Sequence, residues 1–368
     1  MVKLYVMVGI PGSGKSFASE KLAKKYNAII FSSDKYRWKV CGDENCQDRN
    51  QEVFSLLYKE LRQALIEGKN CIFDATNVTR KDRVRIFNQI NGISDIEVIA
   101  YVMRTPLSLC IERDMYRDRT VGSEVIYKFI SRYQFPQRFE GFSSIIIDDF
   151  NIKSYFDAKE YLEESLPYWK NIRSQMENWD QENPHHIRNL NQHSIGLAEH
   201  YNPIEDIEYY AGRLHDVGKL YTKNYDSQGI AHYYNHDSWG VYKILESQLL
   251  EYLAYNMSED ELYTILALIN YHMMAHKDIR GNNEEKYRKI FGSSLYDRLI
   301  KFADADIDAS CTNCLHAQLV QWIKIDKLNL EEIRNKEEFI KLSEKILKED
   351  AIKNSCFWEN NHDEIKGT

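Results

Sequence analysis

A glycine-rich run near the start of this sequence has the residue types and the spacing that bind nucleotide phosphates. Residues 9–16 read GIPGSGKS, which fits the P-loop pattern G-x-x-x-x-G-K-[ST]. In such a loop the backbone N–H groups surround the phosphates, the lysine reaches the β- and γ-phosphates, and the hydroxyl ligates Mg²⁺. We therefore expect ATP or another nucleoside triphosphate, with Mg²⁺, to bind at Gly9, Gly12, Ser13, Gly14, Lys15 and Ser16.

Two carboxylates fall near the ends of β-rich runs, where an acceptor could meet the nucleotide. Asp34 closely follows one run, and Asp74 ends the next. The carboxyl ends of parallel strands share the edge at which open α/β sheets bind ligands, and a carboxylate there can accept a hydroxyl proton. Asn77, Arg80 and Arg83 come soon after and are candidates for acceptor binding. A helix cap with solvated arginines is the alternative interpretation of these residues.

A third feature of the first half is a run of arginines beyond a helical stretch. Arg113, Arg117 and Arg119 are spaced i, i+4 and i+6 in the segment 113–119, RDMYRDR. Residues four apart lie on one helix face, as a lid over a transferring phosphoryl group requires. This spacing predicts a lid with a catalytic arginine.

Histidines and aspartates of the second half have the spacing of a metal site. They lie twenty to forty residues apart, as one ligand from each helix of a bundle would be. Neutral imidazoles with carboxylates suit Mn²⁺, Fe, Co²⁺, Ni²⁺ or Zn²⁺, and such a metal can generate a hydroxide that attacks phosphorus. The predicted positions are His193, His215, Asp216, His236, His272 and Asp306. A lone histidine is more often an ordinary core or surface residue, which is our interpretation of His185, His186, His200 and His276.

The elements that must position these residues differ between the two halves. Short β-rich runs alternate with helical patterns in the first half, which predicts a parallel α/β sheet. The predicted strands are Lys3–Val8, Ala28–Phe31, Cys71–Asp74, Val98–Met103 and Ser144–Ile147. Beyond Asp149 the apolar residues recur at helical spacing, which predicts a nearly all-helical second half. We divide the chain into a P-loop domain (1–150), a helical linker (151–182), a helical metal-binding domain (183–321) and a helical appendage (322–368).

Charge and cysteine usage narrow the class of protein. Residues 1–150 carry 23 Lys and Arg against 19 Asp and Glu, and residues 151–368 carry 25 against 37. The mildly basic first half suits polyanionic substrates. Seven scattered cysteines predict reduced thiols in the cytoplasm, with Cys311 and Cys314 as an isolated CxxC. No run approaches the ~18 apolar residues of a membrane helix, so we expect no membrane span.

Across roughly residues 1–150, the P-loop and the residues that follow it resemble the polynucleotide 5′-kinase family. The resemblance implies that Asp34 is the general base for a 5′-hydroxyl and that Arg37 contacts the acceptor phosphate. It also implies that Asp74 orients the acceptor site and that Arg117 is the lid arginine, with Arg113 as a second candidate.

Residues 183–310 resemble the HD phosphohydrolase superfamily, most closely the HD domains of bacterial tRNA nucleotidyltransferases. The segment 213–219, RLHDVGK, carries the resemblance. It implies that a divalent transition metal is held by His193, His215, Asp216 and Asp306. His236 and His272 would hold a second metal or contact phosphate, so one metal and two remain open. Lys219 and Lys223 would bind substrate phosphate, and His186 would lie near the pocket.

The two halves together resemble bacterial RNA end-healing enzymes. This implies phosphorylation of 5′-hydroxyl ends and removal of 2′,3′-cyclic, 2′- or 3′-phosphate, on RNA rather than DNA, with an RNA ligase acting downstream. One alternative is a small-molecule kinase fused to a nucleotide phosphohydrolase, acting on nucleosides or coenzyme precursors. Another is a regulatory protein in which the P-loop is a switch and the second half senses a messenger. A base at Asp34 and a lid at Arg117 count against the switch.

Overall fold

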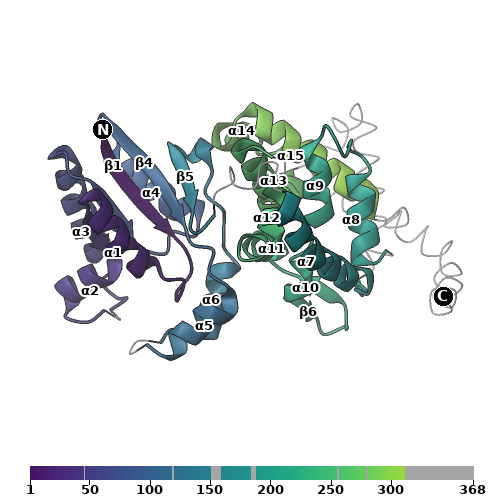
Figure 1. The fold of residues 1–368 in the computed structure, drawn as a ribbon, viewed down its shortest axis with the longest axis horizontal. Helices are drawn as coiled ribbons and strands as arrows, with labels where there is room; N and C mark the ends of the chain where they lie inside the picture. The colour runs from purple at the N-terminus through teal and green to yellow at the C-terminus, as the bar shows by residue number, and fades with distance from the viewer. Residues whose placement is uncertain are drawn as a thin grey trace, which may run out of the picture.

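The protein consists of an α/β half and a helical half that lie side by side in a computed structural model (Figure 1). The structure describes residues 1–44, 46–117, 120–150, 159–183, 188–254, 257–278 and 281–310, without the side chains of 159–164. Within these residues, no helix has the length and apolar character needed to cross a membrane. The predictions for Arg119, for His185 and His186, for Cys311 and Cys314 and for the appendage 322–368 lie outside the described residues.

The first half is built on a parallel five-stranded sheet in the order β2-β3-β1-β4-β5. Its strands are β1 (Val2–Val8), β2 (Ile29–Ser32), β3 (Cys71–Asp74), β4 (Ile96–Val102) and β5 (Ser144–Ile147). Each strand lies within two residues of its predicted run, which confirms the predicted parallel α/β sheet. Val8 pairs with Val102 and Ser32 with Asp74, so the chain leaves these strands at one common edge.

The two faces of the sheet bury alternate residues of β1, as the two-residue period of a strand requires. Leu4 and Val6 belong to the main core, whereas Tyr5 and Met7 pack on the opposite face against Leu22 of the first helix. The helical segments of this half are α1 (Lys15–Tyr26), α2 (Ser33–Cys41), α3 (Asn50–Ile66), α4 (Arg80–Ile90), α5 (Leu107–Met115), α6 (Ser123–Ile130) and the 3₁₀ turn η1 (Arg138–Glu140).

In its described part the second half is helical apart from one hairpin, which the sequence did not predict. Its helices are α7 (Lys159–Glu177), α8 (Leu190–Ala198), α9 (Ile207–Leu214), α10 (Lys219–Thr222), α11 (His236–Leu245), α12 (Leu249–Ala254), α13 (Glu259–Asp278), α14 (Glu284–Phe291) and α15 (Ser293–Ser310). The hairpin pairs β6 (Lys223–Tyr225) with β7 (Ala231–Tyr233). Its turn uses Gly229 at φ 80° and an Asp226 carboxylate that accepts hydrogen bonds from the backbone N–H groups of Gln228 and Ile230.

The two halves share a continuous hydrophobic core, which runs from the sheet into α11 and α13. Buried polar contacts also join them. The Asn270 side chain of α13 accepts from the N–H of Phe135 at 2.9 Å and donates to the carbonyl of Tyr133 at 3.0 Å. The Tyr263 hydroxyl donates to the carbonyl of Ile145 in β5 at 3.2 Å. An amide that satisfies two backbone groups at once fixes the orientation of α13 against the first half.

One prediction about the cysteines is wrong. Cys41, the last residue of α2, forms a disulfide with Cys46, five positions later in the chain. Cys71 and Cys110 are buried free thiols, as the prediction of reduced cysteines requires. The short separation of Cys41 and Cys46 was the signal in the sequence, because cysteines five positions apart can meet where a helix ends.

Candidate functional sites

The P-loop connects β1 to the first turn of α1, where its shape depends on glycine. Gly12 has φ 78° and Gly14 has φ 86°, in the left-handed region that glycine adopts at no steric cost. A Cβ on Gly12 would lie 2.2 Å from the carbonyl oxygen of Cys110. The buried hydroxyl of Ser13 has no hydrogen-bond partner among the described residues. The loop therefore has the close backbone packing and the unused donor expected of a phosphate cradle.

Lys15 lies at the centre of this site, with its ammonium donating to the carbonyl of Ile10 at 2.8 Å. Burial lowers the pKa of Lys15 to about 8, although the charges of Asp74 and Asp34 oppose that shift. The same residue feels the charge of Arg117, which acts to lower its pKa. Three residues predicted from separate segments thus lie close enough to act on the Lys15 ammonium.

Asp74 lies beside the P-loop hydroxyl, which suggests a role in addition to the predicted one. Its Oδ2 accepts a hydrogen bond from Ser16 Oγ at 3.0 Å, and the side chain is buried at the end of β3. In P-loop enzymes a serine or threonine and an aspartate hold Mg²⁺ together. Ser16 and Asp74 are therefore candidate Mg²⁺ residues, and the acceptor-orienting role of Asp74 remains a prediction. Burial raises the pKa of Asp74, and Lys15 opposes this effect.

Asp34 and Arg37 lie on the first turns of α2, directly after β2. Arg37 Nη1 is 2.6 Å from Asp34 Oδ1, and the Asp34 side chain is 52% exposed while that of Arg37 is only 12% exposed. A carboxylate that is open to solvent next to the P-loop can receive an acceptor proton. The roles of Asp34 as base and of Arg37 as acceptor contact remain predictions.

Both lid candidates lie near the P-loop. A Cβ on Gly14 would meet Nη1 of Arg113 at 3.2 Å, so this guanidinium lies over the loop itself. Arg117 pairs with the buried Asp114 at 2.6 Å, and Asp114 also accepts from the backbone of Gly122 at 2.8 Å. Arg113 therefore lies against the P-loop, and Arg117 pairs with Asp114 and acts on the charge of Lys15, so which of the two is the lid arginine remains a prediction.

Two predicted acceptor residues are structural instead. Arg83 is fully buried in α4 and makes two hydrogen bonds to Glu140 of η1, at 2.8 and 2.7 Å. Its Nη1 also donates to the carbonyls of Asn77 and Gln134. Asn77 is buried as well, and its Nδ2 donates to the carbonyl of Met7. Neither side chain can reach an acceptor in this arrangement. Arg80 is partly buried at the start of α4, and its acceptor role remains a prediction.

A cavity of about 610 Å³ opens beside the P-loop, and we call it the P-loop cavity. Its walls come from the P-loop, from α1 and from the segment that follows β4. They include Ser13, Gly14, Lys21, Thr105, Arg113 and Glu246. This volume lies within the ~300–1,000 Å³ of ordinary ligand sites and suits a nucleoside attached to phosphates on the loop.

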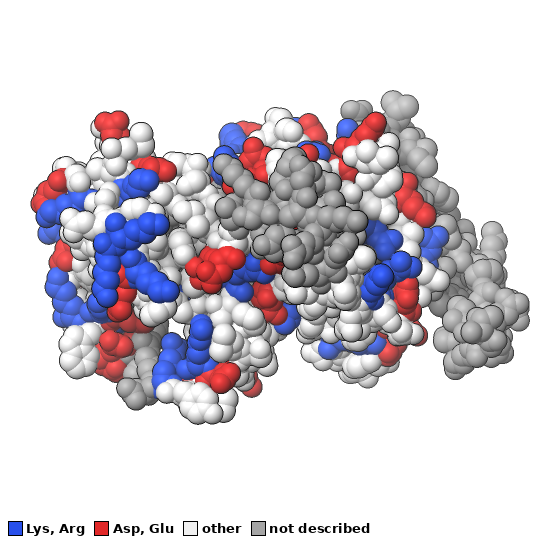
Figure 2. Space-filling model, viewed as in Figure 1, with Lys and Arg blue, Asp and Glu red and all other residues white. Residues whose placement is uncertain are grey.

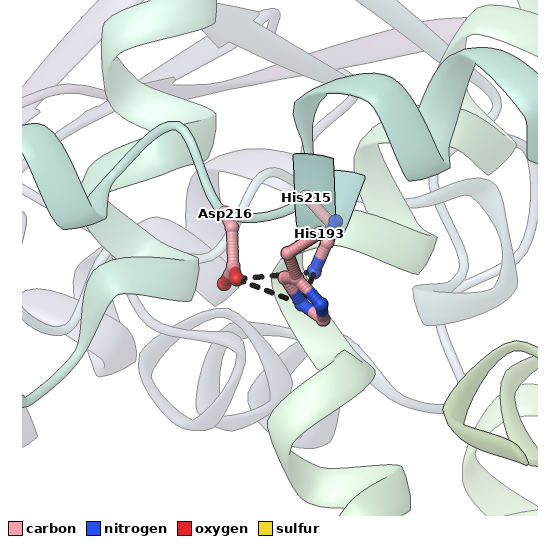
Figure 3. A group of neighbouring side chains, drawn as sticks. All are labelled: His193, His215 and Asp216. Atoms are coloured by element: carbon pink, nitrogen blue, oxygen red, sulfur yellow. Dashed lines mark hydrogen bonds and ion pairs between the residues drawn. The ribbon is translucent and has the colours of Figure 1, made fainter. Parts of the chain in front are cut away.

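The predicted metal residues come together from five elements of the helical half. His193 lies on α8, whose N-terminus is capped by Asn189. His215 and Asp216 follow α9 directly, His236 begins α11, His272 lies on α13, and Asp306 lies on α15. All six side chains are buried. Figure 3 shows the Asp216 carboxylate directed at the His193 and His215 rings.

Asp216 lies between two pairs of imidazoles. Its Oδ2 is 3.2 Å from Nε2 of both His193 and His215, and its Oδ1 is 3.0 Å from Nε2 of His236. His272 Nε2 is 3.9 Å from Oδ1. Within each pair the two Nε2 atoms are close, at 3.2 Å for His193 and His215 and 3.1 Å for His236 and His272. The carboxylate therefore touches two candidate metal positions.

Backbone carbonyls fix the orientation of three of these rings. Nδ1 lies 2.9 Å from the Gly212 carbonyl in His215, and 2.7 Å from a carbonyl in both His236 and His272. A carbonyl only accepts hydrogen bonds, so each Nδ1 donates a proton to its carbonyl, and Nε2 is the ring atom left to bind a metal ion. Nε2 atoms this close to one another and to carboxylates need positive charge between them, from ring protons or from a metal ion. The donor set thus fits a divalent transition metal, with the carbonyls orienting the ligands.

The pKa values of the cluster also indicate that its carboxylates favour a positive charge between them. Burial acts to lower the pKa of His215, but Asp216 and Asp306 outweigh it and raise that pKa to about 10. Burial and the neighbouring His236 and His215 hold the pKa of His272 well below its usual value. Some rings of the cluster therefore bind a proton strongly and others hardly at all. A metal ion would supply the positive charge in place of these protons.

Three further residues complete the surroundings of the cluster. Lys219 Nζ is 2.7 Å from Asp216 Oδ2 and donates to Gln181 at 2.9 Å, so this buried lysine lies at the cluster, and its binding of substrate phosphate remains a prediction. Gln181 and His276 were missed. His276 Nε2 is 2.6 Å from Asp306 Oδ2. Its position four residues after His272 on one helix was the available signal, because such residues share a face. Lys223 pairs with Glu182, and its predicted contact with substrate phosphate remains a prediction.

Comparisons with known proteins cover part of the chain. A family profile described as an AAA domain matches residues 4–136. The chain is 26% identical over 143 residues to the L-seryl-tRNA(Sec) kinase of Methanococcus maripaludis, which covers 36% of this chain and 53% of that protein. It is 35% identical over 104 residues to human 6-phosphofructo-2-kinase/fructose-2,6-bisphosphatase 4, or 23% of this chain and 22% of that protein. The chain therefore spans about half the length of these relatives or less.

Solved structures overlap the chain only in part. The structure of the Pnkp1/Rnl/Hen1 RNA repair complex covers 36% of this chain and 43% of the matched chain, at 22% identity and a TM-score of 0.33. Together with the sheet order and the P-loop, the matching profile shows that the first half has a P-loop kinase fold. The profile ends at residue 136, before the helical half begins.

Proposed function

We propose that this protein heals broken RNA ends: it phosphorylates 5′-hydroxyl ends with ATP and removes 2′,3′-cyclic, 2′- or 3′-phosphate at a metal site of HD type. The observation that carries the proposal is that one chain holds a P-loop and, apart from it, a buried cluster of histidines and aspartates that could hold a metal. The P-loop has Asp34 beside it, and the cluster surrounds Asp216.

In the kinase half, the substrates react by direct phosphoryl transfer. The P-loop and Lys15 hold the β- and γ-phosphates of ATP, while Ser16 and Asp74 hold Mg²⁺. Asp34 takes the proton of the acceptor hydroxyl as its oxygen bonds to the γ-phosphorus. The bond from that phosphorus to the β-γ bridging oxygen breaks, and ADP leaves. Arg113 or Arg117 stabilises the charge on the transferring group.

In the helical half, His193, His215, Asp216 and Asp306 would hold the metal. A divalent ion in such a site supplies Lewis acidity and lowers the pKa of water. Asp216 bridges towards His236 and His272, which can hold a second ion or face the substrate phosphate. Lys219 places a positive charge at the edge of the cluster, where it can hold an anionic phosphoester.

The substrate class is the part of the proposal that depends most on resemblance. Lys and Arg side chains gather on the first half in the face shown in Figure 2, as a polyanionic acceptor requires. RNA in place of DNA, and an RNA ligase that joins the healed ends, follow from the resemblance to end-healing enzymes.

A single RNA oligonucleotide with 5′-hydroxyl and 2′,3′-cyclic phosphate ends tests both activities. It is incubated with ATP and with Mg²⁺ or Mn²⁺, and the two ends are followed separately. Lys15→Ala should lose only 5′ phosphorylation, and Asp216→Ala should lose only the clearing of the 3′ end. Loss of both activities in either folded single variant would contradict two separate centres.

A small-molecule kinase joined to a phosphatase is a second candidate, because a partial relative is named for a sugar-phosphate kinase and bisphosphatase. Competition between acceptors separates the two proposals. An RNA oligonucleotide should compete effectively against nucleosides and sugar phosphates for the kinase site. Preference for any small acceptor over the oligonucleotide would favour the second candidate.

A further inference from the structure

One wall of the P-loop cavity belongs to the helical half. Glu246, which follows the last residue of α11, lines this cavity together with residues of the P-loop and of α1. Its side chain is only 9% exposed, so it is packed into the junction of the two halves. The nucleotide site was predicted within residues 1–150, yet the cavity beside it includes a carboxylate from the second half.

Glu246 and Tyr242 of α11 hold the segment that connects β4 to α5. The Glu246 Oε2 accepts a hydrogen bond from the backbone N–H of Leu107 at 2.6 Å. The Tyr242 hydroxyl donates to the carbonyl of Thr105 at 2.9 Å. Two side chains one turn apart on a single helix therefore fix two backbone groups that are two residues apart.

The segment held in this way touches the P-loop directly. Thr105 Oγ1 donates to the carbonyl of Ser13 at 2.7 Å. Cys110 of the following helix supplies the backbone oxygen against which Gly12 packs. A displacement of residues 104–107 would therefore move both the cavity wall and the loop that cradles phosphate.

Helix α11 is itself firmly placed. It is buried along most of its length and begins at His236, in the metal cluster. At that end a Cβ on Gly218 would lie only 1.9 Å from the His236 carbonyl oxygen, so the helix packs tightly on the segment after Asp216. At the other end Arg104 pairs with Glu251 of α12 at 2.8 Å. The helix can therefore act as a fixed support for the segment 104–107.

We propose that Tyr242 and Glu246 are positioning residues of the ATP site, so that the helical half completes the nucleotide-binding site of the kinase half. The inference rests on the proposed kinase function for its substrate, ATP, but not on the proposed hydrolase. It assigns to the helical half a role that is independent of metal chemistry: it fixes residues 104–107 against the P-loop.

The test measures ATP binding to the full-length protein by calorimetry, together with KM values for ATP and for the acceptor. Glu246→Leu removes the hydrogen bond from Leu107 and the pair with Lys243. Tyr242→Phe removes the hydrogen bond to Thr105 and a contact with Cys110 Sγ. Each variant should weaken ATP binding about five- to tenfold. The KM for ATP should rise by the same factor, while the KM for the acceptor stays unchanged. Glu246→Gln keeps an oxygen that can accept from Leu107, so it should restore most of the affinity.

Glu259→Gln provides a matched control. Glu259 also reaches from the helical half to the first half, where it pairs with Arg138 at 2.7 Å, but it does not line the P-loop cavity. This variant should bind ATP as the wild type does. The proposal is overturned if Glu246→Leu and Tyr242→Phe bind ATP normally, or if Glu259→Gln weakens binding equally. Absence of phosphoryl transfer in the wild type would refute the kinase function alone, because the binding measurement would still decide the inference.

Discussion

At the scale of single residues, the P-loop site shows how burial prepares a side chain for its ligand. Burial lowers the pKa of Lys15 to about 8, and the carboxylates near it keep that pKa from falling further. Phosphates of a bound nucleotide would restore the charge at this position and raise the pKa again. Binding and protonation of Lys15 are therefore linked.

This linkage predicts the pH dependence of ATP affinity. Because the pKa of Lys15 is lower in the free protein than in the complex, binding takes up a proton above pH 8. Affinity should fall about tenfold between pH 7.5 and pH 9. Calorimetry in buffers of different ionisation enthalpy would detect the proton uptake. Lys15→Arg keeps its charge throughout this range, so a slope equal to that of the wild type would contradict the assignment.

Trp38 gives a second prediction at the residue scale. It lies four residues after Asp34 on α2, hence on the same helix face, and is 62% exposed. An exposed aromatic ring next to the candidate base suits the terminal base of an acceptor. Trp38→Ala should raise the KM for an oligonucleotide acceptor about tenfold or more, since stacking contributes ~1–3 kcal/mol per base. The KM for ATP should not change. Trp38→Phe keeps an aromatic ring, so its KM for the oligonucleotide should stay close to that of the wild type. Equal KM values for all three proteins would exclude a stacking role.

At the scale of elements, the bond between α4 and η1 replaces a predicted binding function. Arg83 and Glu140 are both fully buried and joined at 2.7 Å, so they tie the helix after β3 to the chain that leads to β5. A buried charge that loses its partner is strongly destabilising.

Arg83→Met should therefore lower the free energy of unfolding by about 3–5 kcal/mol. Arg85→Met on the same helix is the control, because Arg85 is exposed and its pair with Asp82 is 3.7 Å long. That variant should change stability by no more than about 1 kcal/mol. Denaturant unfolding measures both effects. If Arg83→Met is as stable as the wild type but has a raised KM for the acceptor, Arg83 contributes to acceptor binding after all.

The strands could be predicted from sequence because β-rich runs are local signals. The candidate metal residues could be predicted because the sequence motif around His215 and Asp216 is also local. The role of Arg83 could not. In sequence Arg83 looks like the neighbouring Arg80, and Glu140, its ion-pair partner, lies 57 positions away. Tyr242 and Glu246 were missed for the same reason, since their partners in residues 105–107 lie more than a hundred positions earlier.

At the scale of the whole molecule, the shared core makes the two halves one cooperative unit. Residues of the sheet and of α11 and α13 belong to one cluster, so neither half can unfold without exposing apolar surface of the other.

Thermal unfolding should accordingly show one transition for the described part of the chain. ATP at a hundred times its dissociation constant stabilises the protein by ~2.7 kcal/mol, and this should raise the transition by about 4 °C. A metal ion bound at the cluster should raise the same transition in the wild type but not in Asp216→Ala. Two transitions that respond separately to ATP and to metal would contradict a shared core.

The position of β5 has a consequence for how the chain is made. As the last strand of the sheet order it has one unpaired edge, and Tyr263 of α13 bonds to its Ile145 carbonyl. On the ribosome, the first half emerges complete while α11 and α13 are still to be synthesised. At ~5–20 residues per second this interval lasts on the order of ten seconds. During that time a nascent chain presents an open strand and an uncovered apolar surface, which makes it a substrate for chaperones.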